Sequence, residues 1–346
     1  MLTKEVFRHV NTVPHMAQVS VETMQKLQFE LLPHPVDSPD LIHLITLFSY
    51  HSKMQVTTPR ELSHFFLVAS NTICALPSGD LAAIERVAYE FCEDKAKNGV
   101  LYTEARYSPH FLLAENVPSD IQALSEVVRA VNRGFARGEE SFHIKVRSIL
   151  CTLVGTNQAL DVVELSQIFQ NEGVVGIDMA SQATRDPGEH VEVPDTGVEV
   201  EAFQTAAKLG IHRTVHAGET GSAQMVQRAI ELYHAERIGH GYHVLEDDAV
   251  YNTVRVRDIH LENCPWSSYL TGSVPLSTPK HPVVQFAEDE VNFSISTDDP
   301  MVTGHELQGD YDLANYWGLT EVHLIRAVSD IQKSYCPSRT QFFFHL

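Results

Sequence analysis

The sequence predicts an α/β fold, a (β/α)8 TIM barrel, and three observations support this prediction. After residue 99, short β-branched runs alternate with longer amphipathic stretches, as strands and helices do around a parallel sheet. Eight such runs suit closure into a barrel. Polar residues follow the ends of several different runs, where barrel enzymes carry their functional side chains. A doubly wound open sheet is the alternative.

The predicted strands are short apolar runs separated by helical patterns. The first lies near residues 6–10, and seven more follow residue 99. Helical spacing of apolar residues marks 121–135 and 222–233 among the segments between them. The seven later strands are predicted at 100–105, 144–151, 174–178, 212–216, 237–239, 259–262 and 291–296.

Residues 20–99, between the first and second strands, are too long for one loop and predict several inserted helices. Asp80 is expected to cap the start of the last of these helices, and Gly99 to end it. We expect this insertion to lie over the barrel mouth of a single domain, residues 1–346. Leu62 and Phe65 are candidates for an apolar wall there, although helix packing is the simpler explanation for both.

Composition restricts the classes of partner. The 346 residues are 43% hydrophobic and 20% charged, as in a soluble globular protein. A net charge of −20 argues against a nucleic acid or an anionic membrane surface as partner, and favours a small neutral or cationic molecule. Five cysteines without CxxC pairs suit a reducing compartment. Since neither a signal-like apolar region nor a run of transmembrane length occurs, we expect a cytoplasmic protein.

Residues 214–219 carry the strongest chemical signal. His216 is predicted at the end of a buried strand, and Glu219 follows three residues later. At such a position an imidazole can hold a cation while the glutamate transfers protons. Ala217 and Gly218 between them leave space for a ligand close to the backbone.

Two further fragments repeat this arrangement. In 237–241, His240 lies between two glycines, and in 296–300 the carboxylates of Asp298 and Asp299 follow the last predicted strand. One carboxylate can bind a metal while the other contacts a substrate. A tight bend at His240, and an ordinary turn before Pro300 at Asp298 and Asp299, would explain these fragments without a function. Together, on successive strands, the fragments predict metal-assisted hydrolysis.

These motifs resemble the adenosine deaminase family. The resemblance runs from about residue 57 to about residue 335. The Arg-Ile-Gly-His-Gly motif favours the adenosine branch over the adenine deaminases. The matching segments are 102–109, 146–151, 176–180, 214–221, 237–243, 264–272 and 296–300.

The resemblance implies hydrolysis of adenosine, and of 2'-deoxyadenosine, to inosine and ammonia in purine metabolism. It implies one zinc ion with His216 and Asp298 as ligands. Glu219 would protonate the purine ring at N1, and His240 would orient or deprotonate the attacking water. Asp299 would hold N7. An acid in a dry pocket suits the protonation of N1, because that proton is needed in the transition state.

The sequence departs from the family pattern at two places that bear on the site. Ser181 replaces a glycine whose backbone N–H meets the purine, and the serine N–H is able to do the same. Thr12 and Pro14 replace two histidines that ligate zinc, with His9 and His15 nearby. Because catalytic zinc normally needs three protein ligands, a catalytically impaired homologue that binds nucleoside or a protein partner is an alternative. A metallohydrolase for another substrate is a third possibility.

Overall fold

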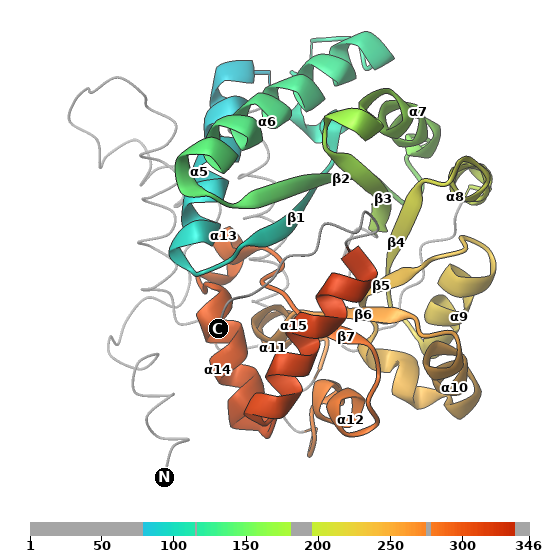
Figure 1. Ribbon diagram of the computed structural model, residues 1–346. Helices are drawn as coiled ribbons and strands as arrows, with labels where there is room; N and C mark the ends of the chain where they lie inside the picture. The colour runs from blue at the N-terminus through green and yellow to red at the C-terminus, as the bar shows by residue number, and fades with distance from the viewer. Residues whose placement is uncertain (1–78, 115, 181–195, 275–277, 336–346) are drawn as a thin grey trace, which may run out of the picture.

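Seven parallel strands form one curved sheet whose strand order follows the chain (Figure 1). The computed structural model describes residues 79–114, 116–180, 196–274 and 278–335. Every neighbouring pair of strands is parallel. The strands are β1 (Tyr102–Tyr107), β2 (Lys145–Leu153), β3 (Val174–Ala180), β4 (His212–Ala217), β5 (Arg237–His240), β6 (His260–Asn263) and β7 (Phe293–Ile295).

This topology confirms the predicted barrel class. The seven strands predicted after residue 99 are all present with shifted ends; for example, the strand expected at 100–105 is β1. Because the strand order never reverses, the sheet is not doubly wound, a topology that needs a switch point. The strand predicted near 6–10 lies outside the described residues.

Helices cover the outer side of the curved sheet (Figure 1). One lies between each successive pair of strands up to β6, namely α6 (Ile121–Phe142), α7 (Ala159–Phe169), α8 (Val198–Leu209), α9 (Ala223–Glu231) and α10 (Asp248–Val256). The remaining helices are α5 (Leu81–Lys97), α11 (Pro265–Thr271), α12 (Pro282–Glu288), α13 (Pro300–Thr303), α14 (Leu307–Trp317) and α15 (Glu321–Tyr335). Within the described ranges, no helix is both long and apolar enough to cross a membrane.

Helix α5 begins and ends where the sequence predicts. The Asp80 carboxylate accepts hydrogen bonds from the backbone N–H groups of Ala82 (2.9 Å) and Ala83 (3.0 Å). These are donors that the first helical turn cannot satisfy itself. After the last turn, Gly99 adopts a left-handed conformation with φ of +74°. The rest of the predicted 20–99 insertion lies outside the described residues.

Apolar packing lies outside the sheet, whereas charged residues fill much of its inner side. The outer core includes Ile177 and Leu150 against Phe169 and Phe203, all fully buried. Glu262 is also buried, yet it stays ionised: burial alone would raise its pKa, but nearby arginines hold that pKa well below its usual range. The curved sheet therefore encloses a polar interior that leads towards the strand ends.

Two buried histidines are expected to make the fold sensitive to acid. His260 contacts Asn292 (2.6 Å) and Ser294 (2.9 Å), and burial lowers its pKa to about 4. His281 lies against Trp317, and burial lowers its pKa to about 3. Since both groups have a pKa near 6.5 when unfolded, the unfolded state binds more protons below that pH. The stability that these neutral histidines contribute is therefore fully present above pH 6.5 and is lost as the pH falls towards 4.

We expect each histidine to cost about 2 kcal/mol of unfolding free energy between about pH 7 and about pH 5. Urea unfolding of metal-free protein at the two pH values measures this loss, and a chelator removes any contribution from metal release. A His260→Gln variant should lose less stability over this interval than the unmodified protein. Equal pH dependence in both proteins would contradict the assignment.

Candidate active site at the strand ends

Three side chains converge at the carboxyl ends of separate strands. His216 lies near the end of β4, His240 is the last residue of β5, and Asp298 follows β7. One ligand atom from each lies within 4.8 Å of the other two. The structure thus brings together the residues that the three sequence motifs singled out. They lie at the end of the barrel where enzymes with this fold carry their active sites.

The backbone is strained at two of these positions. His240 has a φ of +66° and Asp298 a φ of +54°, in the left-handed region that costs roughly 1–2 kcal/mol for a residue with a side chain. Strain of this kind persists only where the surroundings fix the residue. Glycine relieves crowding beside them, because a Cβ on Gly239 would lie 3.2 Å from Cγ of His216, which is tighter than an ordinary contact. The glycine therefore provides room for the imidazole ring.

Hydrogen bonds from neighbouring residues orient two of the three groups. Nδ1 of His216 lies 2.9 Å from Oδ2 and 3.1 Å from Oδ1 of Asp178 on β3. This contact leaves Nε2 of the imidazole to face the cluster, as in carboxylate–histidine–metal arrangements. Ser267 on α11 donates to Oδ2 of Asp298 at 2.7 Å. The sequence analysis gave no role to Asp178 or Ser267, although both lie in segments it singled out.

The two adjacent aspartates have opposite electrostatic settings. Burial raises the pKa of Asp299 to about 7, and the negative charge of Asp298 adds to this rise. Burial would also raise the pKa of Asp298, but the charges of His240 and His216 outweigh it and lower that pKa. Near neutral pH, Asp298 is thus ionised while Asp299 is able to hold a proton. Such divergence between paired carboxyls marks different chemical roles.

Glu219 lies at the edge of the same cluster. Its Oε2 is 3.5 Å from Nε2 of His240, and its side chain is 27% exposed whereas that of His240 is 3% exposed. Among the residues that the structure describes, Nδ1 of His240 is buried without a hydrogen-bond partner. The glutamate therefore faces the open side of the site, where a small molecule would enter.

The donor set fits a zinc ion. Imidazole nitrogen and carboxylate oxygen are ligands that zinc prefers, and catalytic sites use three protein groups with one position left open. His216 and Asp298 supply two such groups, with His240 near enough to act on a molecule at the open position, and the Asp178 and Ser267 contacts supply the outer support. Thr12, Pro14, His9, His15 and Ser181, which the sequence analysis connected with the zinc or the purine, lie outside the described residues.

Sequence comparison identifies the relatives of this chain. The family model for adenosine deaminase matches residues 46–342. The chain is 43% identical to adenosine deaminase of Xenopus tropicalis over 290 residues, which are 80% of this chain and 78% of that protein. It is 41% identical to adenosine deaminase of Mus musculus over 284 residues, 78% of this chain and 77% of that protein.

Solved structures with a similar fold are more distant in sequence. An adenine deaminase from Arthrobacter aurescens aligns with a TM-score of 0.69 at 21% identity, covering 86% of this chain and 90% of its own. An amidohydrolase from Burkholderia ambifaria, solved with bound Zn, aligns with a TM-score of 0.67 at 18% identity, covering 93% and 90%. These likenesses concern the fold. The family match over most of the sequence goes further, and the chain belongs to the adenosine deaminase family of metal-dependent hydrolases.

Proposed function

We propose that this protein hydrolyses adenosine, and 2'-deoxyadenosine, to inosine and ammonia with one zinc ion. The observation that carries the proposal is the convergence of His216, His240 and Asp298 within 4.8 Å, with Glu219 beside them. Supporting it, the curated relatives at above 40% identity are adenosine deaminases. We also propose that the inserted segment 20–99, of which the structure describes α5, covers the barrel mouth.

In the proposed reaction, His216 and Asp298 would hold a zinc ion, which would supply activation of water for attack near neutral pH. His240 orients the attacking water and takes its proton. The oxygen of that water adds to C6 as Glu219 protonates N1, which neutralises the negative charge that the addition places on the ring. The C6–N bond then breaks as His240 gives its proton to the amino group, which leaves as ammonia, and the C6 hydroxyl returns a proton to Glu219 to form the carbonyl of inosine. The distance of 3.5 Å between Oε2 of Glu219 and Nε2 of His240 supports an acid and a base that act on one small volume.

Asp299 has the properties needed to hold the purine. N7 of adenine is a hydrogen-bond acceptor, so its partner must donate a proton. A carboxyl whose pKa burial has raised to about 7 is able to do so near neutral pH. Asp299 follows Asp298 directly, and therefore the group that fixes the base is attached to a group that fixes the metal.

Replacing Asp299 tests this donor role. Asp299→Asn keeps a donor and should lose less than Asp299→Ala, in which the N7 contact is absent. We expect kcat/KM for adenosine to fall by about 10–100-fold in the alanine variant, since a buried partner left unpaired costs ~1–3 kcal/mol. Steady-state kinetics on both variants measure the difference. If 7-deazaadenosine, which lacks N7, shows the same loss with the alanine variant, the contact is not to N7.

The net charge of the chain favours a nucleoside over a nucleotide. The chain as a whole carries a net charge of −20. A phosphate group that approaches such a protein is repelled. The choice of substrate has to be argued because the proteins of similar structure act on different molecules. They include an N6-mAMP deaminase from Arabidopsis and an adenine deaminase from Arthrobacter aurescens.

The experiment is a deamination assay that follows the ultraviolet change as adenosine becomes inosine. With one equivalent of zinc, we expect turnover in the ~1–10³ s⁻¹ range typical of enzymes. Adenine and AMP serve as competitors and as alternative substrates. Folded, zinc-loaded protein without turnover of adenosine would refute the proposal, and faster turnover of AMP or adenine would change its substrate.

A second candidate function is a homologue that binds nucleoside or a protein partner without turnover. Thr12 and Pro14, in place of two ligand histidines of the family, favour it. Metal analysis of purified protein separates the two functions. Stoichiometric zinc with turnover supports the enzyme, whereas adenosine binding in calorimetry with neither zinc nor turnover supports the binding protein.

A further inference from the structure

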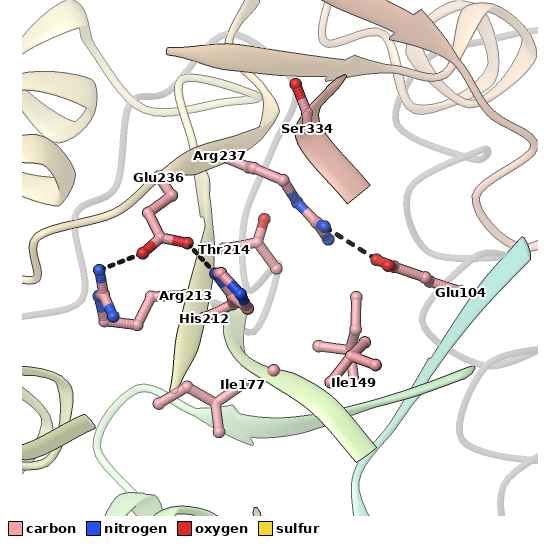
Figure 2. A pocket seen from close by; sticks show the side chains of 11 residues that line it. Glu104, Ile149, Ile177, His212, Arg213, Thr214, Glu236, Arg237 and Ser334 are labelled. Atoms are coloured by element: carbon pink, nitrogen blue, oxygen red, sulfur yellow. Dashed lines mark hydrogen bonds and ion pairs between the residues drawn. The ribbon is translucent and has the colours of Figure 1, made fainter. Parts of the chain in front are cut away.

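Charged side chains from separate strands contact one another inside the curved sheet, and the first of these contacts lies near the beginning of β5. The side chain of Arg237, the first residue of β5, reaches Glu104 of β1, with 2.8 Å between a terminal nitrogen and Oε2 (Figure 2). Three strands separate β1 from β5 in the sheet, so the two side chains meet across the interior. Nε of Arg237 also lies 2.8 Å from Oε1 of Glu262 on β6. Thr214 donates to the same oxygen at 3.2 Å.

These contacts continue from Glu262 to the candidate active site at the carboxyl ends of the strands. The other carboxylate oxygen of Glu262 accepts a hydrogen bond from Arg106 of β1. Arg106 reaches Asp178 at 3.3 Å with its second terminal nitrogen. Asp178 in turn contacts Nδ1 of His216 at 2.9 Å. Carboxylates and guanidinium groups therefore alternate from the beginning of the strands to the imidazole at their ends.

Stability alone is a weak reason for this arrangement. The side chains of Asp178 and Glu262 are 0% and 4% exposed, so both charges are taken out of water. Buried ion pairs contribute little net stability compared with apolar residues of similar volume, but they do fix geometry. A planar guanidinium with two donor edges is suited to hold two carboxylates in fixed positions. Arg106 does this between Glu262 and Asp178.

We propose that Arg106 is a positioning residue for the metal site. It holds the Asp178 carboxylate at Oδ2, the oxygen that also lies 2.9 Å from Nδ1 of His216, and so fixes the orientation in which the imidazole presents Nε2. Arg106 contacts Asp178 and acts on the imidazole through this carboxylate. This inference rests on the proposed zinc site and adds a residue to its outer support. Outer partners of metal ligands commonly alter metal affinity by 10–100-fold.

Arg237 provides a matched control. Each of the two arginines bridges Glu262 and one further carboxylate, but only Arg106 touches Asp178. Arg106→Lys and Arg237→Lys both keep a positive charge, and a lysine is unable to bridge two carboxylates as a guanidinium does. A purely structural role for the charged interior predicts similar effects of the two variants on zinc affinity. A positioning role predicts an effect of Arg106→Lys only.

The experiment titrates metal-free protein with zinc against a chromophoric chelator. We expect the zinc dissociation constant of Arg106→Lys to rise by about 10–100-fold and that of Arg237→Lys to change little. The visible spectrum of the cobalt-substituted proteins should change in Arg106→Lys, because it reports ligand geometry. Urea unfolding of the metal-free variants shows that both are folded.

A double variant tests whether the effect passes through Asp178. Asp178→Asn should weaken zinc binding, and adding Arg106→Lys to it should weaken binding little further, because the same contact is already lost. Additive losses, unchanged affinity in Arg106→Lys, or equal losses in both lysine variants would each overturn the inference. An unmodified protein that binds no zinc instead overturns the proposed function, and the inference with it.

Discussion

Glu219→Gln is expected to lower kcat for adenosine by about 10³-fold while nucleoside affinity changes by less than about tenfold. Glutamine has the shape of glutamate but no proton to give to N1. The proton is needed mainly in the transition state, so its loss affects turnover more than binding. The side chain lies 3.5 Å from His240 and faces the open side of the site, where this transfer would take place.

Single-turnover kinetics and the dissociation constant of inosine measure the two effects separately. Glu246→Gln is the matched control, because Glu246 also pairs with a histidine, His243, at 2.7 Å on the exposed surface after β5. That variant should keep the activity of the unmodified protein. Equal losses of turnover and of affinity in Glu219→Gln would remove Glu219 from the role of acid and make it a binding residue.

The sequence allowed the positions of the main site residues to be predicted because each follows a strand signal closely. His216 and His240 lie at the ends of β4 and β5, and Asp298 is separated from β7 by two residues. In a parallel barrel, all strand ends of one kind meet at one face. Period and polarity along the chain were therefore sufficient to bring residues from three strands together, without knowledge of any single contact.

The supporting contacts were beyond sequence reasoning, because they join residues that are distant along the chain. Arg106 and Glu262 are separated by 156 positions, and Asp178 and His216 by 38. A buried charge in a strand predicts that a partner exists, but the curvature and register of the sheet decide which one. The left-handed backbone of Asp298 is equally hidden, since the sequence does not show which of the aspartates adopt this conformation.

In the proposed zinc site, Asp298→Asn is expected to release the metal ion and to abolish measurable deamination. Asparagine keeps the length of the side chain and tolerates the left-handed backbone at φ of +54°, so the variant should fold. It removes the negative charge that zinc requires of this ligand. Because even outer partners change metal affinity by 10–100-fold, we expect loss of the ligand itself to exceed about 10³-fold.

Metal content after gel filtration, together with turnover, provides the measurement. Asp258→Asn is the matched control, since Asp258 is exposed and has a similar φ of +53° away from the site. His240→Asn supplies the contrast: a base that acts on water leaves the zinc content unchanged while kcat falls by about 10²–10⁴-fold. If His240→Asn also loses its zinc, His240 is the third ligand. In that case the proton from water must go to another group, and Glu219, at 3.5 Å from the ring, is the nearest carboxylate able to take it.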